Sequence, residues 1–335
     1  MKKIMIIVFV ILININLFLN SAEQKEARKI FGKIVFCSER TSDGNLYIFL
    51  LENGEIKNLG IESDIAKISP NGKLVAAFAE TKNNTNRELC IYDLRKNKII
   101  KKHPIKNEQG YDIEWTRDGK YIIYAVKEET GKKNENGRNI YNTYLMRINI
   151  KTGKEEILRE YRDVLFFYNI KNINISLDNK RMVLTIGISG EFKDYENILK
   201  VYVMDIDGKN EKVVWLVGVP LGWFPDNKNI LIHTNRAEDA SKINRKHGRL
   251  YKLNVDTLEK EIIEETVEEV YTTEKLTRDG QYIYSCIYNP FMSFNLVAGD
   301  LKDRSSGTMI TYPIKYEKYG MIFYSDDSSP DWWYE

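Results

Sequence analysis

Ser69-Pro70-Asn71-Gly72-Lys73 is the first of five similar turns in this chain, and these turns decide the fold. The other four copies are Thr116-Arg117-Asp118-Gly119-Lys120, Ser176-Leu177-Asp178-Asn179-Lys180, Phe224-Pro225-Asp226-Asn227-Lys228 and Thr277-Arg278-Asp279-Gly280-Gln281. The Gly or Asn in the fourth position recurs every 47 to 60 residues. A self-similar unit at a nearly constant period is typical of a repeat protein, so the turns predict the architecture before any single residue has a role.

Short apolar segments follow each turn, and their composition predicts strands. They are rich in β-branched and aromatic residues, as in Leu74–Phe78 and Met182–Ile186. Near-continuous apolarity indicates burial on both faces. A second strand, a tight turn such as Asn53-Gly54 or Asp207-Gly208, and an amphipathic strand complete each period. Four antiparallel strands repeated in this way predict the blades of a β-propeller.

The two ends of the repeat region supply the predicted number of blades. Gly32–Phe36 matches the back half of the turn motif and its following strand, whereas Met321–Tyr324 resembles a first strand and leads to Ser329-Pro330-Asp331. We therefore predict an all-β fold, a six-bladed β-propeller of four-stranded antiparallel blades over residues 31–335, with the N- and C-termini closing one blade. Met321–Tyr324 is expected beside Ile34–Phe36. Trp332 stands where the motif has Gly, which predicts a distorted closing turn.

These motifs resemble the WD40-like Pro-Asp repeats of TolB-type periplasmic propellers and of the dipeptidyl peptidase IV propeller. The resemblance extends over roughly residues 31–335. It implies a six-bladed periplasmic propeller that serves as a binding platform. We expect no counterpart of the N-terminal α/β domain of TolB or of the hydrolase domain of prolyl peptidases, so the resemblance is taken to imply neither the Tol–Pal role nor peptidase activity.

The first 22 residues read as a signal peptide, followed by a short linker over residues 23–30. Lys2 and Lys3 precede an apolar run, and Ser21 and Ala22 provide small residues for cleavage near Ala22. The alternative is an uncleaved anchor, but Asn14 and Asn16 interrupt the apolar run before it reaches the length of a spanning helix. We predict a periplasmic or secreted protein with no stable membrane insertion after cleavage.

Charge content bears on the expected partners, and cysteine content bears on disulfide formation. The chain has 50 Lys and Arg against 48 Asp and Glu, with both signs mixed, so nucleic acid is not an expected partner. Three cysteines cannot all pair, and the neighbours of Cys37, Cys90 and Cys286 favour buried thiols. A Cys37–Cys286 bridge is the alternative.

Catalytic and metal-binding patterns are weak in this sequence. The spacing of the three histidines is not that of metal ligands. They are His103, His233 and His247. We predict no catalytic residue, no metal ion and no cofactor, and a non-catalytic role. The alternative is a lyase- or hydrolase-type enzyme that acts on a sugar or small molecule in the axial funnel. Its candidate residues are Asp64, Asp112 and Glu114.

Loop length gives the stronger functional signal. The connections between second and third strands, Lys127 to Asn142, Ser189 to Asn197 and Asn235 to Gly248, are long and charged, and would share one face of a propeller. Ordinary solvated loops are the competing interpretation. We predict a monomer that binds a protein or peptide of the cell envelope through this face and the axial mouth. The candidate binding residues are Tyr111, Asp112, Phe167, Tyr168, Trp223, Arg245, Lys246, Arg249 and Tyr271.

Overall fold

The computed structural model describes most of the chain between residues 32 and 333. The described residues are 32–39, 41, 45–80, 87–105, 108–165, 169–189, 197–216, 218–234, 247–268, 275–276, 282–288, 294–300, 308–309, 315–318, 321–324 and 327–333. Their regular elements are all strands. None of the described residues forms a helix that could cross a membrane. The predicted signal peptide lies outside the described residues.

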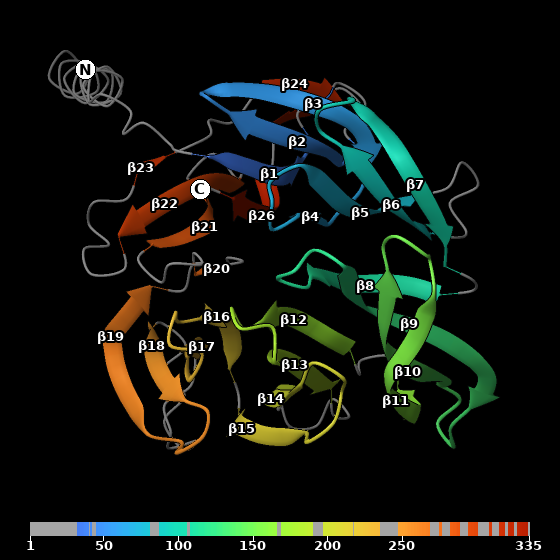
Figure 1. Cartoon of the computed structure of the whole chain (residues 1–335), viewed down its shortest axis with the longest axis vertical. Coiled ribbons are helices and arrows are strands. Elements are labelled where there is room, and N and C mark those ends of the chain that lie inside the picture. The colour runs from blue at the N-terminus through green and yellow to red at the C-terminus, as the bar shows by residue number, and fades with distance from the viewer. Residues whose placement is uncertain are drawn as a thin grey trace, which may run out of the picture.

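Five four-stranded antiparallel blades consist of consecutive strands (Figure 1). Blade 1 contains β4 (Ala66–Ile68), β5 (Leu74–Glu80), β6 (Arg87–Asp93) and β7 (Lys98–Pro104). Blade 2 contains β8 (Glu108–Trp115), β9 (Tyr121–Lys133), β10 (Asn139–Asn149) and β11 (Glu155–Leu165). Blade 3 contains β12 (Asn169–Ile175), β13 (Arg181–Ser189), β14 (Asn197–Asp205) and β15 (Lys212–Leu216). Blade 4 contains β16 (Val219–Trp223), β17 (Asn229–Thr234), β18 (His247–Asn254) and β19 (Lys260–Glu268). Blade 5 contains β20 (Lys275–Leu276), β21 (Tyr282–Tyr288), β22 (Phe294–Asp300) and β23 (Thr308–Met309).

One further four-stranded sheet joins the two ends of the described chain. This composite sheet has the order β26-β1-β2-β3. Its strands are β26 (Asp327–Trp333), β1 (Lys33–Ser38), β2 (Tyr47–Glu52) and β3 (Glu55–Glu62). It lies between blades 5 and 1, because β26 contacts β21 and β22 on one side and β4 on the other. The prediction of six blades, one of them closed by the two termini, is therefore corrected to five blades continuous in sequence and one composite sheet.

The strand that pairs with β1 is not the predicted one. Met321–Tyr324 forms β25, which pairs with β24 (Lys315–Lys318) in a separate two-stranded sheet. The strand beside β1 is β26, so the predicted turn Ser329-Pro330-Asp331 is extended. Proline is tolerated here because β26 is at the edge of its sheet and the register shifts between the Val35 and Cys37 pairs.

The repeated turns adopt one geometry wherever the structure describes them. The fourth residue has a positive φ of 65° at Gly72, 67° at Gly119, 60° at Asn179 and 55° at Asn227, which explains the restriction to Gly and Asn. In each turn, the side-chain oxygen of the preceding Asn or Asp accepts the N–H of the following lysine, at distances from 2.9 to 3.2 Å. The turn motif was therefore predicted correctly at these four positions.

Apolar cores fill the seams between neighbouring sheets. In the seam of blades 2 and 3, for example, Ile123 and Leu145 pack with Ile170 and Leu184. The second strands are buried on both faces, as the sequence predicts, and Val75 to Phe78 are all fully buried. Among the described residues, each of these cores therefore takes side chains from two neighbouring sheets.

Buried thiols, rather than a disulfide, are found at two of the three cysteines. Cys37 and Cys90 are buried in the core between the composite sheet and blade 1, and neither is disulfide-bonded. Burial raises the pKa of Cys90 to about 11, so its thiol is unreactive near neutral pH. The alternative Cys37–Cys286 bridge is not formed. The side chain of Cys286 lies outside the described residues.

Candidate functional site

Asp112, predicted to line the axial funnel, ties blade 2 to blade 3. It lies in the innermost strand β8 and is 7% exposed. Its Oδ2 accepts the backbone N–H of Ile173 in β12 at 2.8 Å, and its Oδ1 accepts the N–H of Ile113 at 2.9 Å. Both carboxylate oxygens are used, so the side chain holds two blades together.

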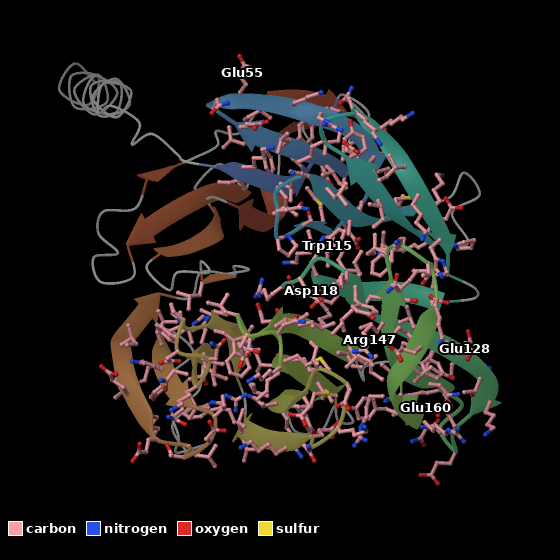
Figure 2. All side chains as sticks on the ribbon, in the orientation of Figure 1. Glu55, Trp115, Asp118, Glu128, Arg147 and Glu160 are labelled. Atoms are coloured by element: carbon pink, nitrogen blue, oxygen red, sulfur yellow. The ribbon has the colours of Figure 1, made fainter. Side chains whose placement is uncertain are left out.

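Trp223 plays a matching role on the other side of β12. It is 3% exposed, and its indole Nε1–H donates to the carbonyl oxygen of Asn174 at 3.0 Å. The Arg181 guanidinium lies 5.3 Å from its ring centroid. Trp115 makes the same kind of contact between blades 2 and 1, where its Nε1–H donates to the carbonyl oxygen of Lys67 at 3.0 Å. Figure 2 shows Trp115 on the inner side of the blades. These tryptophans fix the inner strands in register.

The other predicted binding residues are largely outside the described part of the chain. Arg249 is half-buried in β18, and its Nη1 donates to the hydroxyl of Tyr251 at 3.3 Å. The backbone of Tyr111 belongs to β8. The remaining predicted residues, Phe167, Tyr168, Arg245, Lys246 and Tyr271, lie outside the described residues.

The candidate residues for an axial enzyme have structural partners. Asp64 forms a two-point ion pair with Arg87, with both N–O distances at 3.0 Å. Glu114 Oε1 accepts the N–H of Trp115 at 3.2 Å and lies 4.0 Å from Nη1 of Arg117. Within the described ranges, no group of three His, Cys, Asp or Glu residues could hold a metal ion. The described side chains thus do not form the cluster that an axial metal enzyme needs.

One of the three predicted long loops is an extended β-hairpin. β9 and β10 pair as far as Lys133 and Asn139, and residues 134–138 form the tip. Pairing of β9 with β8 stops at Glu128 and Glu108, so the upper hairpin extends beyond the inner strand. The structure therefore corrects the Lys127–Asn142 loop to a hairpin. Residues 190–196 and 235–246 of the other two loops lie outside the described chain.

At the base of this hairpin, Lys127 is buried between blades 2 and 3. It is 3% exposed, although it is a lysine. Its ammonium lies 4.8 Å from the centroid of the Tyr141 ring, and Thr143 is directly opposite in β10. Burial and, to a lesser extent, the positive charge of Lys171 in β12 together lower the pKa of Lys127 to about 8. We call Lys127, Tyr141, Thr143 and Lys171 the seam site.

Sequence reasoning missed the seam site because it treated Lys127 as the first residue of a loop. The available signal is the alternation along β9: Ile123, Ala125 and Lys127 share one face of the strand. Ile123 and Ala125 belong to the core between blades 2 and 3. A lysine that continues a buried apolar face is a candidate functional residue, because burying its charge is unfavourable.

Replacing Lys127 with Met is expected to stabilise the protein at pH 7 by on the order of 2 kcal/mol, since the folded state then buries no ammonium. The native lysine has a pKa of about 8 in the folded state, below its ordinary value. Between about pH 8 and 10.5 the unfolded chain holds more protons, so the native protein gains stability as the pH rises. The advantage of Lys127→Met should therefore shrink across that window.

Urea denaturation at a series of pH values measures this difference. The matched control is Lys154→Met, because Lys154 is an exposed lysine in the same blade and its removal should change little at any pH. Two results would contradict the assigned cost of burial. Lys127→Met could be less stable than the native protein at pH 7, or its difference in free energy of unfolding from the native protein could be the same at pH 7 and pH 10.5.

Comparisons with known proteins place the chain among β-propellers. No family model matches it. The beta subunit of hydrazine synthase from Kuenenia stuttgartiensis is 28% identical over 160 residues, which are 46% of this chain and 38% of that subunit. The matched segment thus covers well under two thirds of the subunit.

Two solved structures have the same fold. A protein assigned to TolB from Agrobacterium tumefaciens aligns with a TM-score of 0.51 and 14% identity, over 89% of this chain and 98% of that one. Hydrazine synthase of Kuenenia stuttgartiensis aligns with a TM-score of 0.52 and 12% identity, over 78% of this chain and 72% of that one. At these identities the likeness establishes the fold alone: this chain is a β-propeller with TolB-like and hydrazine synthase neighbours.

Proposed function

We propose that this chain is a non-catalytic propeller that binds a protein or peptide through the end that carries the β9–β10 hairpin. The observation that carries the proposal is the contrast between the two ends of the blades. At one end, each described turn is closed by its own Asn or Asp, and neighbouring turns are also joined. Arg117 N donates to Asn179 Oδ1 at 2.9 Å, and Asp178 N donates to Asn227 Oδ1 at 2.9 Å. At the other end, the β9–β10 hairpin extends beyond the last residue of β8 that pairs with it.

Exposed groups on the hairpin suit recognition of another chain. Lys132, Lys133 and Glu135 are exposed near the tip, and the strands beneath them are held in the rigid blade 2. Variable segments on a rigid frame are where binding residues commonly lie. Asp112 and Glu114 make backbone hydrogen bonds, and this favours the binding role over the axial enzyme.

The setting of this activity follows from the sequence and belongs to the same proposal. Cleavage near Ala22 would deliver a monomer to the periplasm or the exterior, where its partner would be a protein or peptide of the cell envelope. The composite sheet would act as the closing unit of a six-membered ring. The near-balance of Lys and Arg against Asp and Glu supports a partner other than nucleic acid.

Site-specific photocrosslinking tests this assignment. A photoreactive residue at position 132, on the hairpin, is expected to capture the partner in cells, whereas one at position 180, in a turn at the opposite end, is not. In a shortened variant, Asn-Gly replaces residues 130–140 and closes the hairpin at the Glu129–Tyr141 pair. This variant should fold, but it should not compete with the photoreactive protein for the partner. The proposal would be overturned if the shortened variant reduced crosslinking as much as the unlabelled native protein does, or if the partner were captured from position 180 alone.

A further inference from the structure

Side-chain hydrogen bonds join neighbouring inner turns at two successive seams. At the seam of blades 2 and 3, Oδ1 of Asn179 accepts the N–H of Arg117 at 2.9 Å. At the seam of blades 3 and 4, Oδ1 of Asn227 accepts the N–H of Asp178, also at 2.9 Å. Both acceptors are the positive-φ Asn in the fourth position of their turn. A residue type that suits the turn geometry therefore also links its blade to the preceding one.

An arginine adds a second bond at each of these seams. Nε of Arg117, in blade 2, donates to the carbonyl oxygen of Ile175 in blade 3 at 3.0 Å. Nη2 of Arg181, in blade 3, donates to the carbonyl oxygen of Asn227 in blade 4. Hydrogen bonds from a charged donor are stronger than neutral ones, so these bonds add substantially to each seam. We call the four bonds, which run from Arg117 to Asn227, the turn belt.

The seam of blades 1 and 2 cannot form the counterparts of these bonds, for covalent reasons. Gly119 stands in the fourth position of the blade 2 turn, where blades 3 and 4 have Asn, and it has no side-chain oxygen. The arginine donors occupy the second and the sixth position, counted from the first residue of the turn. In blade 1 these positions are Pro70 and Leu74, whose side chains carry no N–H. The turn belt therefore ends at blade 2.

Space remains at Gly119 for the missing acceptor. A Cβ there would meet only Cδ of Pro70, at 4.0 Å, which is an ordinary van der Waals distance. The φ of Gly119 is 67°, close to the 60° of Asn179, so Asn can adopt it. The backbone N–H of Asn71 is the counterpart of the donor at Asp178. One substitution can therefore restore an acceptor at this seam.

We propose that the turn belt makes blades 2, 3 and 4 one rigid arc, and that the propeller opens more readily at the seam of blades 1 and 2 than at either belted seam. The innermost strands of this arc, β8, β12 and β16, follow one another round the propeller (Figure 1). The seam of blades 1 and 2 is closed by other bonds, such as that from Lys101 Nζ to the carbonyl oxygen of Ile150 at 2.8 Å. What it lacks is the belt at the turn end. Opening there would move the β9–β10 hairpin relative to blade 1, and the inference does not rest on the proposed binding role.

Two tryptophans report on the two kinds of seam through the same kind of hydrogen bond. The indole Nε1–H of Trp115 donates across the seam of blades 1 and 2 at 3.0 Å, to the carbonyl oxygen of Lys67. The indole Nε1–H of Trp223 donates across the seam of blades 3 and 4 at 3.0 Å, to the carbonyl oxygen of Asn174. Both side chains are buried, so each N–H exchanges with solvent only when its surroundings open. In the native protein, NMR should show the Trp115 indole exchanging at least about tenfold faster than the Trp223 indole.

Gly119→Asn is expected to extend the belt to blade 1. It should slow exchange of the Trp115 indole by about fivefold and leave that of Trp223 unchanged. The matched control is Gly137→Asn. Gly137 has a similar φ of 75° in the hairpin tip, where a Cβ would meet nothing within 4 Å. Both variants replace a positive-φ Gly by Asn, but only Gly119→Asn can add a bond across a seam.

Asn227→Gly is the converse variant, because it removes the belt acceptor at the seam of blades 3 and 4. It should speed exchange of the Trp223 indole by about fivefold. Its control is Asn53→Gly, in an outer turn of the composite sheet. Asn53 is exposed, and its φ of 54° matches the 55° of Asn227. The control should leave the Trp223 indole unchanged.

The comparison of the two native indoles decides first, and it needs no variant to fold. A Trp223 indole that exchanges as fast as that of Trp115, or faster, would overturn the inference. Equal effects of Gly119→Asn and Gly137→Asn on the Trp115 indole would also overturn it. A slower Trp115 indole in Gly119→Asn alone, or a faster Trp223 indole in Asn227→Gly but not in Asn53→Gly, supports it.

Discussion

Gly208→Ala is expected to lower the free energy of unfolding by about 4 kcal/mol, whereas Gly54→Ala should lower it by about 1 kcal/mol. Both glycines lie in outer hairpin turns and have nearly the same positive φ, 81° and 82°. The backbone strain of an alanine is therefore the same in both. The difference comes from the surroundings: a Cβ on Gly208 would lie 2.4 Å from the carbonyl oxygen of Leu158, and one on Gly54 would meet nothing within 4 Å.

The clash at Gly208 is with backbone that cannot move freely. Leu158 belongs to β11 of blade 2, and Gly208 belongs to the turn between β14 and β15 of blade 3. The two segments are held together by Glu211, whose Oε2 accepts from Arg159 Nε at 3.0 Å and from the Tyr161 hydroxyl at 2.5 Å. Relieving the clash would separate the blades and break these bonds.

Equilibrium denaturation in urea, followed by circular dichroism, gives both values from one pair of variants. The unfolding transition should remain cooperative in each. Similar losses for Gly208→Ala and Gly54→Ala would mean that strain at positive φ accounts for the whole effect. The close approach of blades 2 and 3 would then contribute nothing.

The repeat was predictable because local chemistry sets it. Positive φ strongly favours Gly, Asn or Asp, so Gly72 and Asn179 mark their turns in the sequence itself. The continuous apolar runs of β5 and β13 predict their burial on both faces. These features need no knowledge of distant contacts.

The identity of the closing strand was not predictable from the same signals. Met321–Tyr324 has a better strand pattern than Asp327–Trp333, which contains Pro330. The choice is made by the pairing with β1, where a register shift opposite Phe36 accommodates the proline. Only the long-range pairing distinguishes the two segments.

For the candidate residues, the strand that carries each one was predictable from the sequence, but its contact partner was not. Repeat alignment correctly put Asp112 and Trp223 on innermost strands, β8 and β16. It could not reveal that both hold β12, through the adjacent backbone groups of Ile173 and Asn174. Which neighbour a side chain meets depends on the angle between blades, and the sequence does not state it.

Ending the chain after Asp326 is expected to abolish cooperative folding, because it removes β26. That strand covers the edge of β1 and contacts β4, β21 and β22, so its loss would open two seams together. The expected cost is at least about 5 kcal/mol, on the order of the whole stability of a domain. Removing only residues 334 and 335, which follow β26, should have little effect.

Hydrogen exchange in β1 measures this most directly. In the intact chain, the amides of residues 33–38 should exchange as slowly as those of β5. In the shortened chain they should exchange rapidly, and a synthetic peptide of residues 325–335 should restore their protection by adding the missing strand. Retained protection of β1 without β26 would contradict the closure of the propeller by the two ends of the chain.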